Sequence, residues 1–201
     1  MPVAKRRTQL ERRTETTRRL LDAATDSLIE LGYAGASIQA ICERAGVSQG
    51  GLFRHFPTRE TLMVAVGEDV ADRILATYAK KFESLRDREQ PLVVAMRLVR
   101  EQCRSRLNQA WYELAIASRT NASLRKSLVP AGKRYEDKIE RLARTLLPDL
   151  ATKLGDRFPA VVGTIIAVFD GEVIHRLITK DTRDDDARME VLMLLAGQLL
   201  A

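Results

Sequence analysis

The chain is poor in the residues on which several common kinds of protein depend. Its 201 residues include two cysteines, two histidines and one tryptophan, and aromatic residues make up 5%. Because Cys42 and Cys103 are too few and too isolated for a disulfide framework, we expect reduced thiols, as in a cytoplasm. His55 and His175 without a Cys/His cluster predict no metal site, and we expect no other cofactor.

Long apolar runs and catalytic signatures are also missing. No stretch of about 18 apolar residues occurs, so we expect no membrane-spanning helix. The first residues lack the apolar centre of a secretory signal. No nucleophile elbow, phosphate-binding loop or zinc-binding helix motif is present. Asp184, Asp185 and Asp186 are better explained as favourable charge at a helix N-terminus than as a metal cluster. We therefore predict a cytoplasmic protein that is not an enzyme.

Charged residues and helix formers are abundant instead. Hydrophobic residues make up 45% and charged residues 30%, with a net charge of +6, a composition that suits an all-helical protein. Residues 1–19 hold seven Lys/Arg and two Glu, a net charge of +5. Such a basic segment is compatible with nucleic-acid binding. For residues 1–10 a solvated tail is the alternative. Arg13, Thr17 and Arg18, which open the first helix, are candidates for phosphate contacts.

Residues 37–56 have the pattern of two short helices joined by a tight turn. Ser37 is a good N-cap, and Gly46 stands where a left-handed residue would end the first helix. Between them, apolar residues repeat at helical spacing: Ile38, Ile41, Cys42 and Ala45. Ser48 can cap the second helix, which Pro57 ends by withholding an N–H. The pair is a candidate helix-turn-helix.

The second of these helices has the features of a surface that approaches DNA. Gly50 and Gly51 in its first turn cost about 1 kcal/mol each in helix propensity. Glycine is favoured where the backbone must come close to another surface. The outward side chains, Gln49, Arg54 and His55, can hydrogen-bond base edges or phosphates. The alternative is a small helical hairpin whose glycines merely ease packing.

These residues resemble the N-terminal DNA-binding domain of the TetR family of bacterial transcriptional regulators. The resemblance covers about residues 16–66. It rests on an ordered set of positions: Leu20 to Ala24, Gly32-Tyr33, Ser37-Ile38, Ile41, Ala45 to Ser48, Gly50, Leu52-Phe53, His55 to Pro57 and Arg59. Two positions depart from the family pattern. Phe53 replaces a tyrosine whose hydroxyl touches a phosphate, and Arg59 replaces a lysine.

The resemblance implies an all-α fold of two domains: a three-helix DNA-binding domain over 1–57, and a helical effector-binding and dimerisation domain over 58–201. It also implies double-stranded DNA as partner. We expect Gln49, Gly51 and Arg54 to face bases. The full set predicted to contact DNA is Arg13, Thr17, Arg18, Ser37, Ser48, Gln49, Gly50, Gly51, Phe53, Arg54, His55 and Arg59.

Amphipathic patterns predict helices through the rest of the chain. Thr58 can cap a helix that runs to about residue 83. Further helices are expected at 91–106, 107–119, 121–147, 158–180 and 184–200. Pro130 should kink or split the third of these.

The segment 160–169 is apolar nearly all round, so a helix there must be covered on more than one side. Burial against a second copy satisfies this, and Gly163 and Gly171 would permit close approach. Asp170-Gly171 also resembles the family's dimerisation segment. We predict a homodimer through a four-helix bundle, with an ordinary monomer core as the alternative. The predicted interface residues are Val161, Ile165, Val168, Gly171, His175, Met189, Leu192, Met193, Ala196 and Leu199.

The resemblance further implies a small-molecule effector bound in the helical C-terminal domain. The candidate pocket residues are Met96, Cys103, Trp111, Tyr112 and Phe169, each of which can instead be a core residue. The sequence therefore predicts a homodimeric repressor of a palindromic operator that a small organic effector releases. The alternatives are an architectural or activator protein of the same fold that answers no small molecule, and a helical enzyme.

Overall fold

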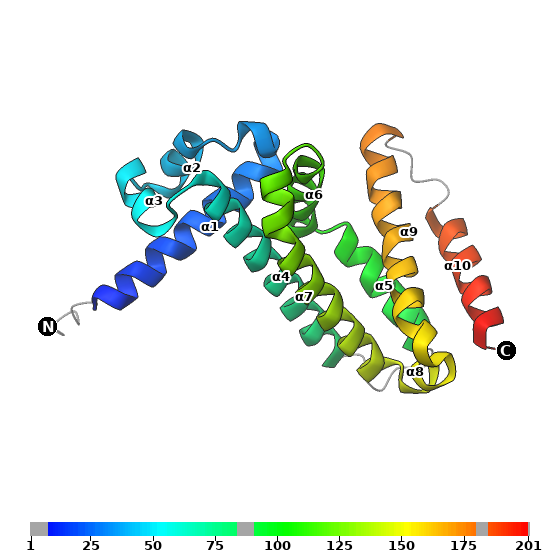
Figure 1. The fold of residues 1–201 in the computed structure, drawn as a ribbon. Coiled ribbons are helices and arrows are strands. Elements are labelled where there is room, and N and C mark those ends of the chain that lie inside the picture. Colours follow the sequence, from blue (N-terminus) through cyan, green and yellow to red (C-terminus); the bar gives the residue numbers. More distant parts are fainter. Residues whose placement is uncertain (1–7, 84–90, 180–184, 201) are drawn as a thin grey trace, which may run out of the picture. The chain divides into compact units, whose positions relative to one another are not determined.

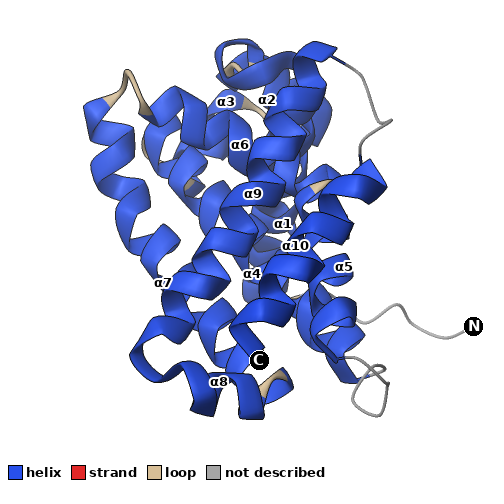
Figure 2. Ribbon diagram, turned by 90° about the vertical axis from the view of Figure 1, so that its right-hand side faces the viewer, coloured by secondary structure: helices blue, strands red, loops and turns tan. Residues whose placement is uncertain are grey.

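Helices make up most of the part of the chain that the structure describes. A computed structural model describes residues 8–83, 91–179 and 185–200. Within these ranges the chain forms helices and short connections, and no strand is present (Figures 1 and 2). The predicted all-α fold is confirmed. Among the described helices, none is both long and apolar enough to cross a membrane.

The helices divide into two compact units. The first comprises Met1–Arg73 and Arg106–Gly132, and the second comprises Ile74–Ser105 and Lys133–Ala201. Two long helices, α4 (Arg59–Glu83) and α7 (Ala122–Leu146), contribute to both units. The predicted boundary after residue 57 therefore falls inside a compact unit, because the first three helices pack with later segments of the chain.

The first unit is built on α1 (Gln9–Gly35). A capping box fixes its start: the N–H of Glu11 donates to Oγ1 of Thr8 at 3.2 Å, and the N–H of Thr8 donates to Glu11 at 2.7 Å. Gly32, with φ of 71°, interrupts the helix near its end. Helix α1 packs against α2 (Ile38–Ala45) and against α6 (Arg106–Ser118).

The helix-turn-helix forms as the local pattern predicts. It consists of α2 (Ile38–Ala45) and α3 (Gln49–His55), with Gly46 left-handed between them. The serine caps are both made: Ala40 N donates to Ser37 Oγ, and Gly51 N donates to Ser48 Oγ, each at 3.1 Å. Thr58 caps α4 in the same way, through a 3.1 Å bond from the N–H of Thr61.

The second unit contains α5 (Pro91–Cys103), α8 (Pro148–Leu154), the short 3₁₀ helix η1 (Gly155–Arg157), α9 (Phe158–Thr179) and α10 (Asp185–Leu200). One apolar cluster joins α5 to the α7–α8 joint and to Phe158 of α9. A second cluster joins Met96 and Cys103 of α5 to Phe169 of α9 and Met189 of α10.

Pro130 and Pro148 both lie within helices of this part of the chain. Helix α7 continues through Pro130 and is not split. Lys126, Val129 and Pro130 are all exposed, so water can satisfy the Lys126 carbonyl that loses its N–H partner. Helix α8 was not predicted, although Pro148 stands at its first turn, the position that proline favours in helices.

Candidate nucleic-acid interface

Helix α3 has a buried side and an exposed side. Leu52 is completely buried, and Phe56, which follows the helix, is 9% exposed. Gln49, Gly50, Phe53 and Arg54 are exposed. Phe53 is 43% exposed, which is unusual for so large an apolar side chain on a short helix. The outward side of α3 therefore offers an amide, a guanidinium, an aromatic ring and bare backbone to a partner.

The two glycines of α3 have different surroundings. A Cβ atom on Gly51 would lie 2.9 Å from Cγ1 of Val47 and 3.2 Å from Oγ of Ser48, so packing within the fold favours a glycine there. A Cβ atom on Gly50 would meet nothing within 4 Å. No packing against the described residues explains Gly50, because the space above it is open. An external surface that approaches the backbone at Gly50 would explain it.

Two of the arginines predicted to contact DNA are exposed and can bind a partner. Arg13 on α1 and Arg54 on α3 form no ion pair with any residue that the structure describes. Because neither charge is neutralised within this part of the chain, each can bind a phosphate or a base edge at no cost in broken contacts.

Arg18, in contrast, is engaged within the first unit. Its guanidinium donates to Asp22 of α1 at 2.7 and 3.0 Å, and to Asp69 of α4 at 2.5 and 2.7 Å. The hydrogen bond to Asp69 is the main reason that the pKa of Arg18 is raised. The side chain that was predicted to contact a phosphate thus holds α4 against α1.

Arg59 is likewise bound within the unit. Its Nε donates to the Ala36 carbonyl at 3.1 Å, and Nη2 donates to the Tyr33 carbonyl. The guanidinium also lies 4.2 Å from the centre of the Tyr33 ring. These contacts fix the segment that links α1 to α2, so Arg59 acts on the position of the helix-turn-helix.

Thr17 and His55 contact each other. Oγ1 of Thr17 and Nδ1 of His55 are 3.0 Å apart, and this hydrogen bond joins α1 to the end of α3. Both residues are half-buried, so each keeps a surface that a phosphate can reach. The two cap serines, Ser37 and Ser48, accept a backbone N–H, and their hydroxyl hydrogens remain available to an acceptor outside the chain.

These contacts predict different effects for substitutions of Arg54 and Arg59. Arg54→Ala should weaken operator binding by about 1–3 kcal/mol and relax sequence choice at one base position, with no loss of stability. Arg59→Ala should lower the free energy of unfolding by about 1–3 kcal/mol, because two backbone carbonyls lose a charged donor. Fluorescence anisotropy and urea unfolding on both variants separate the two effects. If Arg59→Ala kept full stability and lost only DNA affinity, the proposed anchoring role would be wrong.

Several residues that position the helix-turn-helix were not predicted. Arg19 of α1 donates to the Ala45 and Gly46 carbonyls at the end of α2. Glu30 of α1 accepts from Arg44 of α2 and, at 3.1 Å, from Arg106 of α6. The charges of Arg19 and Glu30 did not reveal these contacts in the sequence, because each hydrogen bond joins residues far apart along the chain.

The Glu30 contacts predict a pH dependence of stability. Hydrogen bonds from Arg44 and then from Arg106 lower the pKa of Glu30 from 4.5 to about 2. Because the pKa is lower in the folded state, this stabilisation is complete above the unfolded pKa and is lost as the pH falls towards 2. Glu30→Gln should therefore lower the unfolding midpoint at pH 7, and the gap from the unsubstituted protein should close at low pH.

Thermal unfolding across a pH series tests this prediction. Glu136→Gln is the matched control, because Glu136 is an exposed glutamate on α7 that pairs with no described residue. The control should unfold as the unsubstituted protein does at every pH. A gap for Glu30→Gln that stays constant from pH 7 to 2 would refute the assignment.

The predicted pocket residues lie in different units. Met96, Cys103 and Phe169 are at most 3% exposed and belong to one apolar cluster of the second unit. Trp111 and Tyr112 lie on α6 in the first unit, where Tyr112 accepts a 3.0 Å hydrogen bond from Asn108. The five residues therefore do not form one cavity within either unit.

The predicted interface residues divide into inward and outward sets. Met189 is buried, and Ile165, Leu192 and Met193 pack against the same cluster of their own chain. Val161 and Ala196 are half-buried, and the side chain of Leu199 is outside the described residues. The exposed members of the set are Val168, Gly171 and His175.

Comparison with known proteins agrees with this geometry. The model of the bacterial regulatory proteins of the tetR family matches residues 20–66, from α1 into α4. An HTH-type transcriptional regulator of Mycobacterium tuberculosis is 37% identical over 193 residues, which is 95% of this chain and 98% of the relative. CymR of Pseudomonas putida is 44% identical over 80 residues, 38% of this chain and 39% of CymR.

Solved structures share the fold at lower identity. A TetR-family member from Streptomyces coelicolor is 24% identical with a TM-score of 0.67, over 90% of this chain and 98% of that one. The multidrug binding protein EbrR, solved with ethidium, is 24% identical with a TM-score of 0.68 over the same shares. From the full-length relative and the matched helix-turn-helix, we conclude that the chain belongs to the tetR family of bacterial transcriptional regulators, DNA-binding proteins that are not enzymes.

Proposed function

We propose that the protein is a homodimeric repressor, which binds a palindromic operator with one α3 from each subunit and leaves it when a small organic effector binds. The observation that carries this proposal is the open space above Gly50 on an exposed, basic α3. A helix so shaped is suited to a major groove, where it can present Gln49 and Arg54 to base edges.

An uncovered apolar surface supports the homodimer. On α9, Ile174, Leu177 and Ile178 are 39%, 66% and 83% exposed. On α10, Leu194 and Leu195 are 71% and 54% exposed. A monomer rarely leaves so many large apolar side chains in water, and a second copy would cover them. We call these residues, with Val168 and Val191, the α9/α10 face.

Small residues make the α9 part of this face suitable for close helix packing. Gly163 and Gly171 are exposed, and a Cβ atom on either would meet nothing within 4 Å. Ala160 and Ala167 are exposed on the same helix. A partner helix can therefore approach the α9 backbone closely, as in the four-helix bundle predicted from the sequence.

Dimerisation is what would give the protein operator specificity. Two α3 helices related by a twofold axis can read half-sites about one turn of DNA, or about 34 Å, apart. One seven-residue helix buries too little surface for tight specific binding, and the second copy raises the affinity through effective concentration.

The effector response is proposed from the fold relationship. EbrR, which shares the fold, is a multidrug binding protein solved with ethidium and with malachite green. We expect the second unit of this chain to bind an organic molecule as well, and binding there to favour a conformation with lower operator affinity.

The proposal is tested by selecting duplexes from a random library with the full-length protein. We expect a palindromic consensus that binds at least about 1000-fold more tightly than random duplex at physiological salt. A panel of organic compounds, added to the complex and followed by anisotropy, should include members that release the DNA. Failure to enrich any sequence would contradict the DNA-reading role, and enrichment without release by any compound would contradict the effector role alone.

A further inference from the structure

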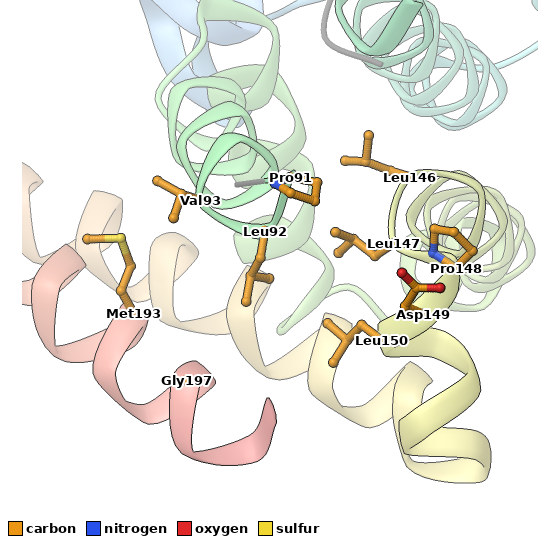
Figure 3. A pocket seen from close by; sticks show the side chains of 10 residues that line it. All are labelled: Pro91, Leu92, Val93, Leu146, Leu147, Pro148, Asp149, Leu150, Met193 and Gly197. Atoms are coloured by element: carbon orange, nitrogen blue, oxygen red, sulfur yellow. The ribbon is translucent and has the colours of Figure 1, made fainter. Parts of the chain in front are cut away.

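A hollow of about 400 Å³ opens in the second unit, where three segments meet. They are the start of α5, the joint between α7 and α8, and the second half of α10 (Figure 3). Leu92 of α5 lies between Met193 of α10 and Leu147 and Leu150 of the joint. The volume of the hollow falls within the range of small-molecule sites in proteins.

The wall of this hollow is mainly apolar, and its charge is negative. Leucine, valine, proline and methionine side chains line it, and Pro91 and Pro148 contribute no backbone N–H. Of the described residues that line it, Asp149 alone is charged. The Asp149 carboxylate forms no hydrogen bond or ion pair with any described residue. The wall therefore disfavours an anion and leaves one acceptor for a donor or a cation.

Gly197 keeps one side of the hollow open. It lies within α10, where glycine is less favourable than alanine. A Cβ atom there would meet nothing within 4 Å, so no contact with the part of the chain that the structure describes accounts for the missing side chain. The same residue lines the hollow, and a larger side chain at this position would take up part of its space.

We propose that this hollow is a binding site for a compact, mainly apolar organic molecule that is neutral or carries one positive charge, with Asp149 meeting its polar group. The proposal rests on the effector role proposed above and assigns that role a place and a ligand class. The pocket residues predicted from the sequence do not line this hollow, which lies at the joint of α5, α8 and α10.

The position of α10 gives the site a regulatory consequence. Met193 and Gly197 of this helix line the hollow, while Leu194 and Leu195 belong to the α9/α10 face. A ligand that shifts α10 must therefore change the surface offered to the partner subunit. By linkage, dimerisation changes the ligand affinity by the same factor as the ligand changes the affinity between subunits.

The test uses the full-length protein and three probes. N-phenyl-1-naphthylamine is neutral and fluoresces when it enters an apolar site, and 1-naphthylmethylammonium and 1-naphthoate are similar in size but opposite in charge. We expect one saturable site per chain for the neutral dye. We also expect the cation to displace it at a concentration at least about tenfold lower than the anion, because the one charged wall residue is a carboxylate.

Three variants locate the site. Gly197→Leu should weaken dye binding at least about tenfold by filling the hollow. Ala187→Leu is the matched control, because it adds a leucine at an exposed position of α10 that does not line the hollow, and it should bind as the unsubstituted protein does. Asp149→Asn should remove the preference for the cation and keep the affinity for the neutral dye. Thermal unfolding of each variant shows that it is folded.

The outcomes distinguish a failure of the proposed binding site from a failure of the proposed effector role. Dye affinity unchanged in Gly197→Leu, or absence of any saturable site, would overturn the proposed site. Dye binding that is lost in Leu194→Glu but kept in Gly197→Leu would also overturn it, because the dye would then occupy the α9/α10 face. Saturable binding that Gly197→Leu removes supports the site, whether or not the bound dye releases DNA, and a failure to release DNA would count against the effector role alone.

Discussion

Gly50→Leu is expected to weaken operator binding strongly in a protein that remains fully folded. The open space at Gly50 means that the Cβ atom of the new side chain meets no described residue within 4 Å. The leucine side chain would project from the exposed side of α3 into the space that we propose bound DNA occupies. We expect a loss of at least about 2 kcal/mol in binding free energy, or about 30-fold in affinity. Stability should stay constant or rise, since leucine is the better helix former.

The neighbouring glycine supplies the contrast. Gly51→Ala places a Cβ atom 2.9 Å from Val47, so we expect the gain of about 1 kcal/mol in helix propensity to be cancelled or exceeded by overpacking. Gly50→Ala should keep that gain. Anisotropy with the selected operator and urea unfolding on the three variants check both statements. Normal operator affinity in Gly50→Leu would mean that DNA does not approach α3 at this point.

The second large effect is expected from Leu194→Glu. Leu194 is 71% exposed on α10, so the substitution disturbs little within its own chain. In the proposed dimer it buries a charge in an apolar contact, which we expect to dissociate the subunits at micromolar concentration. Operator affinity should then fall by about 100-fold or more, because the second α3 no longer binds as part of the same molecule.

Ile116→Glu is the matched control for this prediction. Ile116 on α6 is 53% exposed and lies outside the α9/α10 face. The control should sediment as a dimer and bind the operator normally. Analytical ultracentrifugation measures the assembly state of both variants, and anisotropy measures their affinity. A Leu194→Glu protein that stayed dimeric would remove α10 from the proposed interface.

The parts of the fold that the sequence predicts correctly are those that depend on near neighbours. Ser37, Ser48 and Thr58 cap their helices within three residues of themselves, and Gly46 ends α2 directly after Ala45, the last of its regularly spaced apolar residues. The start of α1 rests on a local contact of the same kind, the capping box of Thr8 and Glu11, but the sequence analysis did not identify it. Local hydrogen bonds of this kind can be read from spacing alone.

The roles of the arginines could not be predicted in the same way. Arg18 and Arg59 lie in a basic, helix-turn-helix setting, where a phosphate contact is the natural expectation. Their partners in the fold are Asp69, 51 residues from Arg18, and the carbonyls of Tyr33 and Ala36. A side-chain charge read from the sequence does not reveal whether tertiary contacts have already engaged it.

The side of α9 that faces outward could not be predicted from the sequence, for a different reason. Helix α9 is apolar nearly all round, so its periodicity does not distinguish the side that packs inward from the side that faces out. The structure turns Ile165 and Phe169 inward, to Met189 and Met193 of α10. Val168, Ile174 and Ile178 remain outside, and the surface proposed for the partner subunit follows from this orientation.

The central claim is that two copies of an exposed α3 read DNA as a twofold pair. Hydroxyl-radical footprinting of the full-length protein on its selected operator tests this most directly. We expect two protected segments of equal strength, related by a dyad and centred about 10 base pairs or a multiple of that apart, and both lost together in Leu194→Glu. Protection of a single half-site, or an unchanged double footprint in a monomeric Leu194→Glu protein, would contradict it.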